Sequence, residues 1–170
     1  MKLDAQCKRC LAKLRAGVIP LAIAILSVSL ALPAAASLGG DVDSVQADAT
    51  HMQAMHRIAS TTAKYTVHEI QFTGGTVVRE YVSPSGQVFG VAWQGPGLPD
   101  MQQLFGSYFA QYAQGLQAAR ADASRRARRA PILIQQPGLV VQMGGHFRAF
   151  SGSAYIPDML PQGVGPEAIR

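Results

Sequence analysis

Cysteine is almost absent from this chain of 170 residues, because the only two, Cys7 and Cys10, stand close to the N-terminus. Their C-x-x-C spacing resembles redox and metal-binding motifs. They lie, however, in a basic leader of the kind that is removed on export, and a removed segment supplies neither thiols nor ligands. We therefore expect a mature protein without disulfides, although export compartments permit them, and a fold that depends on packing alone.

Familiar catalytic motifs are missing as well. The sequence contains no G-x-S-x-G elbow, no H-E-x-x-H helix, no Walker loop and no dinucleotide fingerprint. Ser151-Gly152-Ser153 lacks the strand–turn–helix context that a nucleophilic serine needs. The sequence therefore predicts no cofactor, and it favours a non-enzymatic role over an enzymatic one.

The first 36 residues have the pattern of an export signal. An uncharged apolar run covers residues 17–32, and Ala34-Ala35-Ala36 supplies the small residues that signal peptidase reads, so we predict cleavage before Ser37. An uncleaved anchor is the alternative, because the run extended through Leu38 approaches the roughly 20 residues that span a bilayer. The predicted location is the periplasm or the medium. The basic residues of the leader are Lys2, Lys8, Arg9, Lys13 and Arg15.

Net charge after the leader gives little reason to expect a polyanionic partner. The whole chain carries 15 basic and 10 acidic residues, a net of +5. Five basic residues and Asp4 fall in the leader, which leaves 10 basic and 9 acidic residues and a net of +1. We therefore predict no nucleic-acid partner and no stable membrane insertion after cleavage. Another envelope protein or a small anionic ligand is the partner that we consider.

The rest of the chain is predicted to form one domain. Residues 37–63 are rich in Ala, Ser, Thr, Asp and Gln and predict a flexible, low-complexity lead-in, with one loose helix as an alternative on the thin stripe of Val45, Ala49, Met52 and His56. Residues 64–157 predict a single α+β domain, which is interrupted by an Arg-rich loop at 120–130. This Arg run favours a solvated linker over a site for nucleic acid or anionic lipid, since long like-charge runs repel and extend. Residues 158–170 predict a C-terminal tail on the surface, with packing over the sheet as an option.

Three antiparallel strands are predicted over Tyr65–Phe72, Thr76–Val82 and Gln87–Trp93. Gly74-Gly75 suits a two-residue hairpin turn, and Ser83-Pro84-Ser85-Gly86 suits a type I turn with a left-handed glycine and a bulge. These turns predict that one face collects Ile70, Phe72, Val77, Arg79, Tyr81, Phe89, Val91 and Trp93, and that Glu69 opposes Glu80 on the other face, with Val67, Val78, Val82, Val88, Gly90 and Ala92.

One long amphipathic helix is predicted to follow Asp100, whose carboxylate can cap it. Apolar residues recur there at spacings of three and four, and their natural partner is the Phe89/Val91/Trp93 face. Later apolar runs predict two or three more strands before Pro157. The predicted fold is α+β, an antiparallel sheet of about five strands in the order β-β-β-α-β-β with the helix on one face. The helix stripe is Met101, Leu104, Phe105, Tyr108, Phe109, Tyr112 and Leu116.

Two groups of residues could carry chemistry. His51, Met52, Met55 and His56 combine imidazole with thioether, the soft donors that suit Cu(I), so a copper-handling protein is one alternative.

A small periplasmic enzyme that uses His68, Arg79 or His146 is the other alternative. Arg79 on an apolar face calls either for pairing or solvent contact, or for a ligand carboxylate or phosphate. Glu69 and Glu80 read as a solvated pair of carboxylates rather than an acid–base pair.

The pattern as a whole resembles a bacterial family catalogued as domain of unknown function 2844. The resemblance lies in Tyr65–Val67, in Gly75–Ser83 (G-T-V-V-R-E-Y-V-S), in Val88–Pro96 (V-F-G-V-A-W-Q-G-P), and in the later stretches Leu139–Gln142, Gly144–Phe147 and Ala154–Pro157. It implies an exported single-domain protein and supplies no catalytic residues. The Arg run and the His/Met cluster lie outside the resembling stretches.

Overall fold

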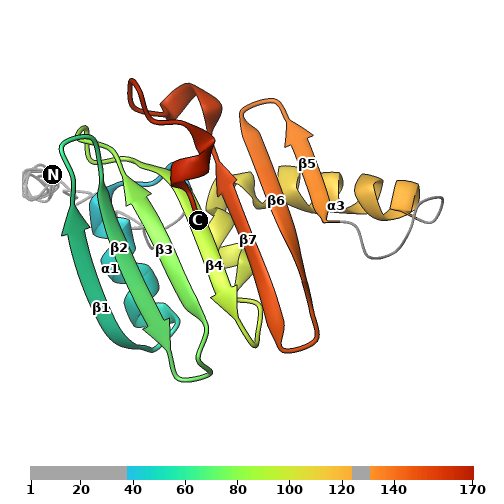
Figure 1. Ribbon diagram of the computed structural model, residues 1–170, viewed down its shortest axis with the longest axis horizontal. Helices are drawn as coiled ribbons and strands as arrows, with labels where there is room; N and C mark the ends of the chain where they lie inside the picture. The colour runs from blue at the N-terminus through green and yellow to red at the C-terminus, as the bar shows by residue number, and fades with distance from the viewer. Residues whose placement is uncertain (1–37, 124–130) are drawn as a thin grey trace, which may run out of the picture. The chain divides into compact units, whose positions relative to one another are not determined.

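A computed structural model describes residues 38–123 and 131–170 of the chain. The predicted export signal, its cleavage site, Cys7 and Cys10 lie outside the described residues, as does most of the Arg-rich loop. The described residues form an α+β fold with one antiparallel sheet of seven strands, in the spatial order β1-β2-β3-β4-β7-β6-β5 (Figure 1). The predicted class is therefore confirmed, whereas the predicted number of about five strands is wrong.

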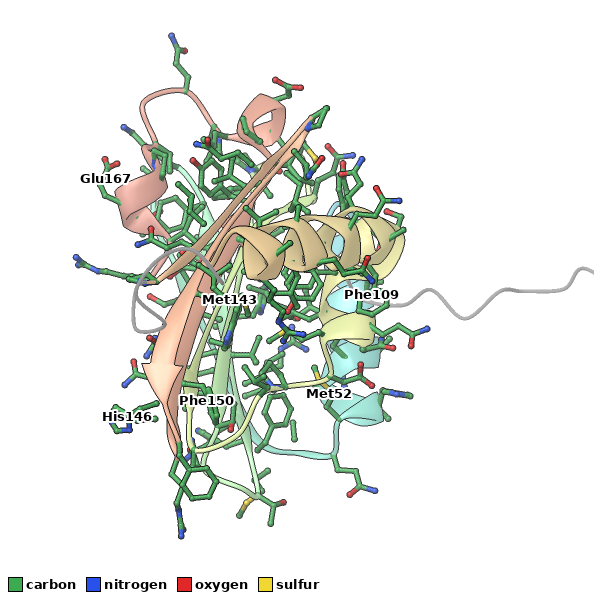
Figure 2. The ribbon with its side chains drawn as sticks, turned by 90° about the vertical axis from the view of Figure 1, so that its right-hand side faces the viewer. Met52, Phe109, Met143, His146, Phe150 and Glu167 are labelled. Carbon is green, nitrogen blue, oxygen red and sulfur yellow. The ribbon has the colours of Figure 1, made fainter. Side chains whose placement is uncertain are left out.

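Helices cover one face of the sheet and the C-terminal segment covers the other (Figures 1 and 2). The strands are β1 (Ala54–Thr61), β2 (Thr66–Phe72), β3 (Val77–Val82), β4 (Val88–Gly95), β5 (Ile132–Gln136), β6 (Leu139–His146) and β7 (Ala149–Tyr155). The helices are α1 (Val42–His51), α2 (Met101–Phe105) and α3 (Phe109–Ala123), with short 3₁₀ turns at η1 (Gly106–Tyr108), η2 (Pro157–Met159) and η3 (Pro166–Ala168).

Residues 42–61 form a helix and an edge strand where the sequence suggests a flexible lead-in. Asp41 caps α1, because its carboxylate accepts from the Ser44 N–H at 3.0 Å. The chain then turns at Gln53, whose φ is +53°, and β1 pairs with β2 from Ala54↔Phe72 to Thr61↔Thr66. β1 escapes detection because it is an edge strand with mostly exposed residues, so it carries no apolar alternation.

The first hairpin is one residue out of the predicted register. The Phe72 N–H donates to the carbonyl of Thr76 at 2.9 Å, so these two residues close the hairpin. The loop between them therefore holds three residues, Thr73, Gly74 and Gly75, rather than two glycines. A shift of one residue moves side chains to the opposite face. Glu69 therefore pairs with Arg79, and the predicted Glu69–Glu80 pair is wrong.

The second hairpin has the predicted turn and an unpredicted bulge. Gly86 adopts a φ of +84°, the Ser83 N–H donates to the Gln87 carbonyl, and Val82 pairs with Val88 as expected. The next pair is Tyr81↔Gly90, so the register shifts between Tyr81 and Val82 and β4 carries an extra residue.

The bulge and the hairpin slip together redistribute the core. Val78, Val82 and Val88 join Ile70, Phe72, Val91 and Trp93 on the helix-covered face. Tyr81 and Phe89 belong instead to the core under the C-terminal segment. Because side chains alternate along β3, Val77 and Arg79 lie on the same face as Tyr81. Their predicted place on the helix face is wrong.

The predicted long helix begins where expected and then breaks. Asp100 caps α2 by accepting from the N–H groups of Gln102 and Gln103 at 2.9 and 3.0 Å. Gly106 then takes a φ of +47°, a left-handed conformation that ends a helix. The break lets Phe105 contact Trp93 edge-on, with ring centroids 6.1 Å apart, while Phe105 stacks on Tyr112 of α3 at 4.4 Å.

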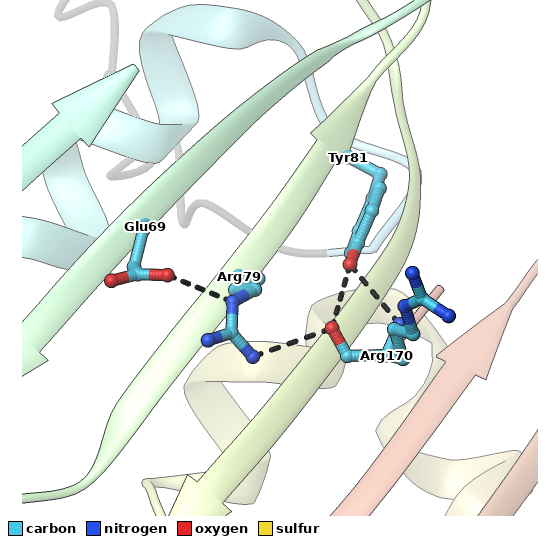
Figure 3. A network of polar contacts seen from close by, with 4 residues as sticks. All are labelled: Glu69, Arg79, Tyr81 and Arg170. Atoms are coloured by element: carbon cyan, nitrogen blue, oxygen red, sulfur yellow. Dashed lines mark hydrogen bonds and ion pairs between the residues drawn. The ribbon is translucent and has the colours of Figure 1, made fainter. Parts of the chain in front are cut away.

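The C-terminal segment packs on the second face through Ile169, which joins the core of Tyr81, Phe89 and Ala92. The Tyr81 hydroxyl donates to the Arg170 carbonyl at 2.8 Å and accepts from the Arg170 N–H at 3.1 Å (Figure 3). Arg79 donates to the same carbonyl and pairs with Glu69 at 2.8 Å. The structural explanation for Arg79, pairing with an acid, is the one that the contacts support.

Candidate functional site

Two carboxyl groups meet in the core beneath α1. Asp48 lies on α1 and Glu80 lies in the middle of β3, with exposed fractions of 0 and 1%. One oxygen of Asp48 accepts from the Nε2 amide of Gln103, on α2, at 2.5 Å. The other Asp48 oxygen and both Glu80 oxygens have no conventional hydrogen-bond donor among the described residues. Buried polar atoms require partners, so the two carboxyls must satisfy each other.

The electrostatics of the pair indicate how they do so. Burial raises the pKa of Asp48 to about 6, although the hydrogen bonds from Gln103 and with Glu80 oppose this rise. Burial also raises the pKa of Glu80 well above its ordinary value, and the charge of Asp48 raises it further. The hydrogen bond between them lowers the pKa of Asp48 and raises that of Glu80, so Glu80 is the protonated donor and Asp48 the charged acceptor when the pair holds one proton.

Arg57 and His68 form a second polar contact beside the pair. The Arg57 Nη2 donates to Nδ1 of His68 at 3.0 Å, and its Nη1 donates to Oε1 of Gln46 at 2.5 Å. Burial lowers the pKa of His68, and the charge of Arg57 lowers it further. Because a guanidinium only donates, His68 is neutral with its proton on Nε2. Within the described residues, no carboxylate lies within ion-pair distance of Arg57.

A pocket of about 290 Å³ opens between the C-terminal half of α1 and the start of β1. Arg57 lines it and thereby connects the pocket to the buried network through His68. Arg57 thus presents a planar set of N–H donors at the pocket wall. The side-chain amides of Gln46 and Gln53 and the hydroxyl of Thr50 line the pocket beside it. The lining residues are Gln46, Ala49, Thr50, Gln53, Ala54, Met55, His56 and Arg57.

The structure does not bring the three candidate enzymatic residues together. His68 is buried on the helix-covered face, where it pairs across strands with Glu80. Arg79 lies on the opposite face with Glu69 and Arg170 (Figure 3). His146 is exposed at the β6–β7 turn, where its Nδ1 contacts the Phe147 carbonyl. It also lies well apart from Met52 of the His/Met cluster (Figure 2).

The His/Met cluster is divided between two elements. His51 ends α1 and Met52 is its C-cap, whereas Met55 and His56 belong to β1. Only Met55 and His56 line the pocket. Within residues 38–123 and 131–170, no three His, Cys, Asp or Glu side chains are grouped as metal ligands would be.

Sequence reasoning misses four residues of this site, namely Gln46, Asp48, Arg57 and Gln103, and misplaces Glu80 as a surface carboxylate. Asp48 and Arg57 stand in a segment whose composition resembles a linker. One signal is available: Val45, Ala49 and Met52 mark a thin helical stripe, and Asp48 falls on the same side. A polar residue within such a stripe is a candidate for a buried, paired group.

No helix within the described ranges combines the length and the apolar character that a bilayer crossing requires.

Comparisons with known proteins place the chain in a family. Neither the curated proteins nor the solved structures include one that matches it. A family model described as "Protein of unknown function (DUF2844)" matches residues 34–169. The match covers the whole described fold except Arg170, including the acid pair, the pocket and the C-terminal segment. The resemblance noted in the sequence is thereby confirmed, and the chain belongs to the DUF2844 family.

Proposed function

We propose that this chain is an exported, non-enzymatic binding module that holds a small anionic ligand at Arg57, in the pocket between α1 and β1. The periplasm or the medium is the proposed location, on the strength of the basic leader, its apolar run and the alanines before Ser37. The observation that carries the binding role is the state of Arg57, a cation at a pocket wall whose side-chain partners are neutral.

Arg57 is already positioned for an anion. Contacts to Gln46 and His68 fix the guanidinium at two of its nitrogens, so little side-chain entropy remains to be lost on binding. A guanidinium fork matches the two oxygens of a carboxylate or a phosphate. The contact with Gln46 lies at the surface, where an anion can replace the amide without leaving a buried group unpaired. This points to a ligand with a terminal carboxylate or phosphate.

The pocket wall adds hydrogen-bonding groups suited to the polar part of such a ligand. Thr50 and Gln53 line it beside Gln46, while Ala49, Ala54 and Met55 provide apolar contact. A volume near 290 Å³ is at the lower end of the range for small-molecule sites. The ligand that fits is a small metabolite-sized anion.

Titration of the purified mature protein with inorganic phosphate and with acetate, followed by amide NMR shifts, tests the binding role. We expect shifts confined to α1 and β1. We expect R57Q to weaken binding at least tenfold, because about 1.5–3 kcal/mol is typical of a hydrogen bond to a charged group. R57K keeps the charge without the fork and should weaken binding less. R79Q is the matched control, because Arg79 is paired with Glu69 on the other face. Equal loss in R57Q and R79Q would refute the site.

Intact-mass measurement of the secreted or periplasmic fraction tests the location. A mature chain that starts at Ser37 is expected. A full-length chain found only in membranes, with Cys7 and Cys10 retained, would show that the leader is an anchor instead.

Copper handling is the second candidate that a specific observation favours, since Met55 and His56 both line the pocket. Cu(I) binding that falls on Met52→Ala/Met55→Ala would assign the site to metal. Turnover of a carboxylate or phosphate ester that depends on His68 would favour the enzymatic alternative.

A further inference from the structure

We propose that a single proton shared by Asp48 and Glu80 holds α1 on the sheet. Loss of this proton as the pH rises releases α1, and the pocket loses the wall that α1 provides. The inference rests on the proposed function, because α1 forms one wall of the pocket in which we place the anion. It adds a means by which the surroundings control that site.

The pair joins two elements that few other contacts hold together. Asp48 belongs to α1 and Glu80 to β3, and Gln103 adds α2 through its bond to Asp48. The buried residues of α1 are Ser44, Val45, Asp48 and Ala49, so Val45 and Ala49 are its only buried apolar side chains. A helix of ten residues is marginal by itself in water. The docking of α1 therefore depends heavily on Asp48.

The neighbourhood of the pair disfavours a second negative charge. On α1, His51 is close enough to favour ionised Asp48, whereas Asp100, at the start of α2, disfavours it. Among the described residues, Arg57 of β1 is the one cation that favours ionised Glu80.

Across the strands, Glu80 faces neutral His68 on β2 and apolar Val91 on β4. Arg57 already donates to Gln46 and His68. Two ionised carboxylates would therefore repel each other in a site that is closed to solvent.

The element that yields under this repulsion is α1. β3 is paired along its length with β2 and with β4, so moving Glu80 would break a ladder on each side. Moving Asp48 breaks no strand pairing: α1 lifts from the sheet with Val45 and Ala49 and gives up the bond to Gln103, which frees both carboxylates to reach solvent. Because Gln46, Ala49 and Thr50 of α1 line the pocket, the same movement removes its wall.

The expected pH dependence follows from proton linkage. Glu80 keeps its proton in the closed form well above its ordinary pKa of 4.5, whereas in the open form it ionises near that value. Above about pH 6, where Asp48 is already ionised in the closed form, each opening releases the one proton of Glu80, so the open fraction rises up to about tenfold per pH unit. Above the raised pKa of the closed form the dependence ends.

Hydrogen exchange of the α1 amides in the mature full-length domain directly tests the latch, by which we mean the retention of α1 on the sheet by the shared proton of Asp48 and Glu80. The parent and E80Q are compared at each pH from 5 to 9, so that the intrinsic pH dependence of exchange cancels in the ratio. The side-chain amide that E80Q introduces can donate permanently to Asp48, which mimics the shared proton. We expect the ratio of parent to E80Q exchange to be near 1 at pH 5 and at least tenfold by pH 8.

Two further variants keep the test specific. E69Q makes the same chemical change on the opposite face, where Glu69 pairs with Arg79, and should exchange like the parent at every pH. D48N keeps an acceptor for Gln103 and offers Glu80 a donor, so its pH slope should be smaller than that of the parent. A parent-to-E80Q ratio that does not change with pH, or an E69Q effect as large as that of E80Q, would overturn the latch.

Acetate affinity at pH 6 and pH 8 separates this inference from the proposed function, since the charge of acetate does not change in that range. The parent should lose affinity at pH 8 in proportion to the opening of α1, while E80Q should retain it. Pair-dependent opening with no acetate binding at any pH would support the latch and refute the anion site. Binding that weakens equally in E80Q would overturn the latch while the anion site stood.

Discussion

Replacing Asp48 by asparagine should make the protein more stable at neutral pH, even though it removes a charged group from a hydrogen bond. Asparagine has nearly the same shape, its side-chain oxygen still accepts from Gln103, and its amide can donate to Glu80. What the substitution removes is the need to hold a carboxylate in the core, where Asp48 has an exposed fraction of 0%.

The magnitude follows from the pKa of Asp48. It rises from 3.8 to about 6 on folding, and one pH unit corresponds to about 1.4 kcal/mol, so the cost of ionising Asp48 in the folded state is about 3 kcal/mol. Because the folded pKa is the higher one, the full stability is present below about pH 4 and is lost as the pH rises to about 6. Above that value the loss is complete.

Urea denaturation followed by far-UV circular dichroism at pH 4, 5, 6 and 7 measures this effect. The free energy of unfolding of D48N minus that of the parent should grow by about 3 kcal/mol from pH 4 to pH 7. D43N, on the exposed side of the same helix, is the control and should change the free energy by less than about 1 kcal/mol. A D48N difference that is the same at pH 4 and pH 7 would refute the reasoning.

Two further predictions concern packing and backbone strain. Trp93→Ala should cost about 3–5 kcal/mol, because Trp93 is 2% exposed and lies over Gly152, where an added Cβ would come within 2.3 Å of its ring; a urea midpoint equal to that of the parent would contradict this. Arg148→Gly should raise the free energy of unfolding by about 0.5–1 kcal/mol, because Arg148 has a φ of +66°; thermal melts that show a lower midpoint would contradict it.

The sequence reveals the fold wherever turn residues fix a strand pair, and fails where a single residue changes the register. Gly86 takes the left-handed conformation predicted for it, and Asp100 caps the helix as predicted. Gly74-Gly75 fits loops of two or three residues equally well, so local pattern could not choose between them. The bulge at Phe89 has only a weak local sign, the neighbouring Gly90 inside the strand. It depends on both faces being buried, which only the C-terminal segment and the helices together bring about.

The candidate site was less accessible to sequence reasoning than the fold, and for a related reason. Glu80 becomes buried only through the register of the first hairpin, and Asp48 becomes its partner only because α1 docks above it. Neither carboxylate differs in sequence from a surface acid. Arg57 is held at the pocket by its hydrogen bonds to His68 and Gln46, which stand 11 residues away on either side in the sequence. Such sites are defined by tertiary contacts between residues without motif spacing.

Trp93 has a practical consequence, since it is the only tryptophan in the chain. Its indole N–H is buried without a hydrogen-bond partner among the described residues. The ring of Phe105 packs against the indole in an edge-to-face contact. An indole in such apolar surroundings emits at short wavelength, and that emission moves to the red when water reaches it. The native chain thus contains its own optical reporter, which sits where β4, β7 and the first turn of helix after Asp100 meet. Loss of this junction can be followed in real time without an introduced label.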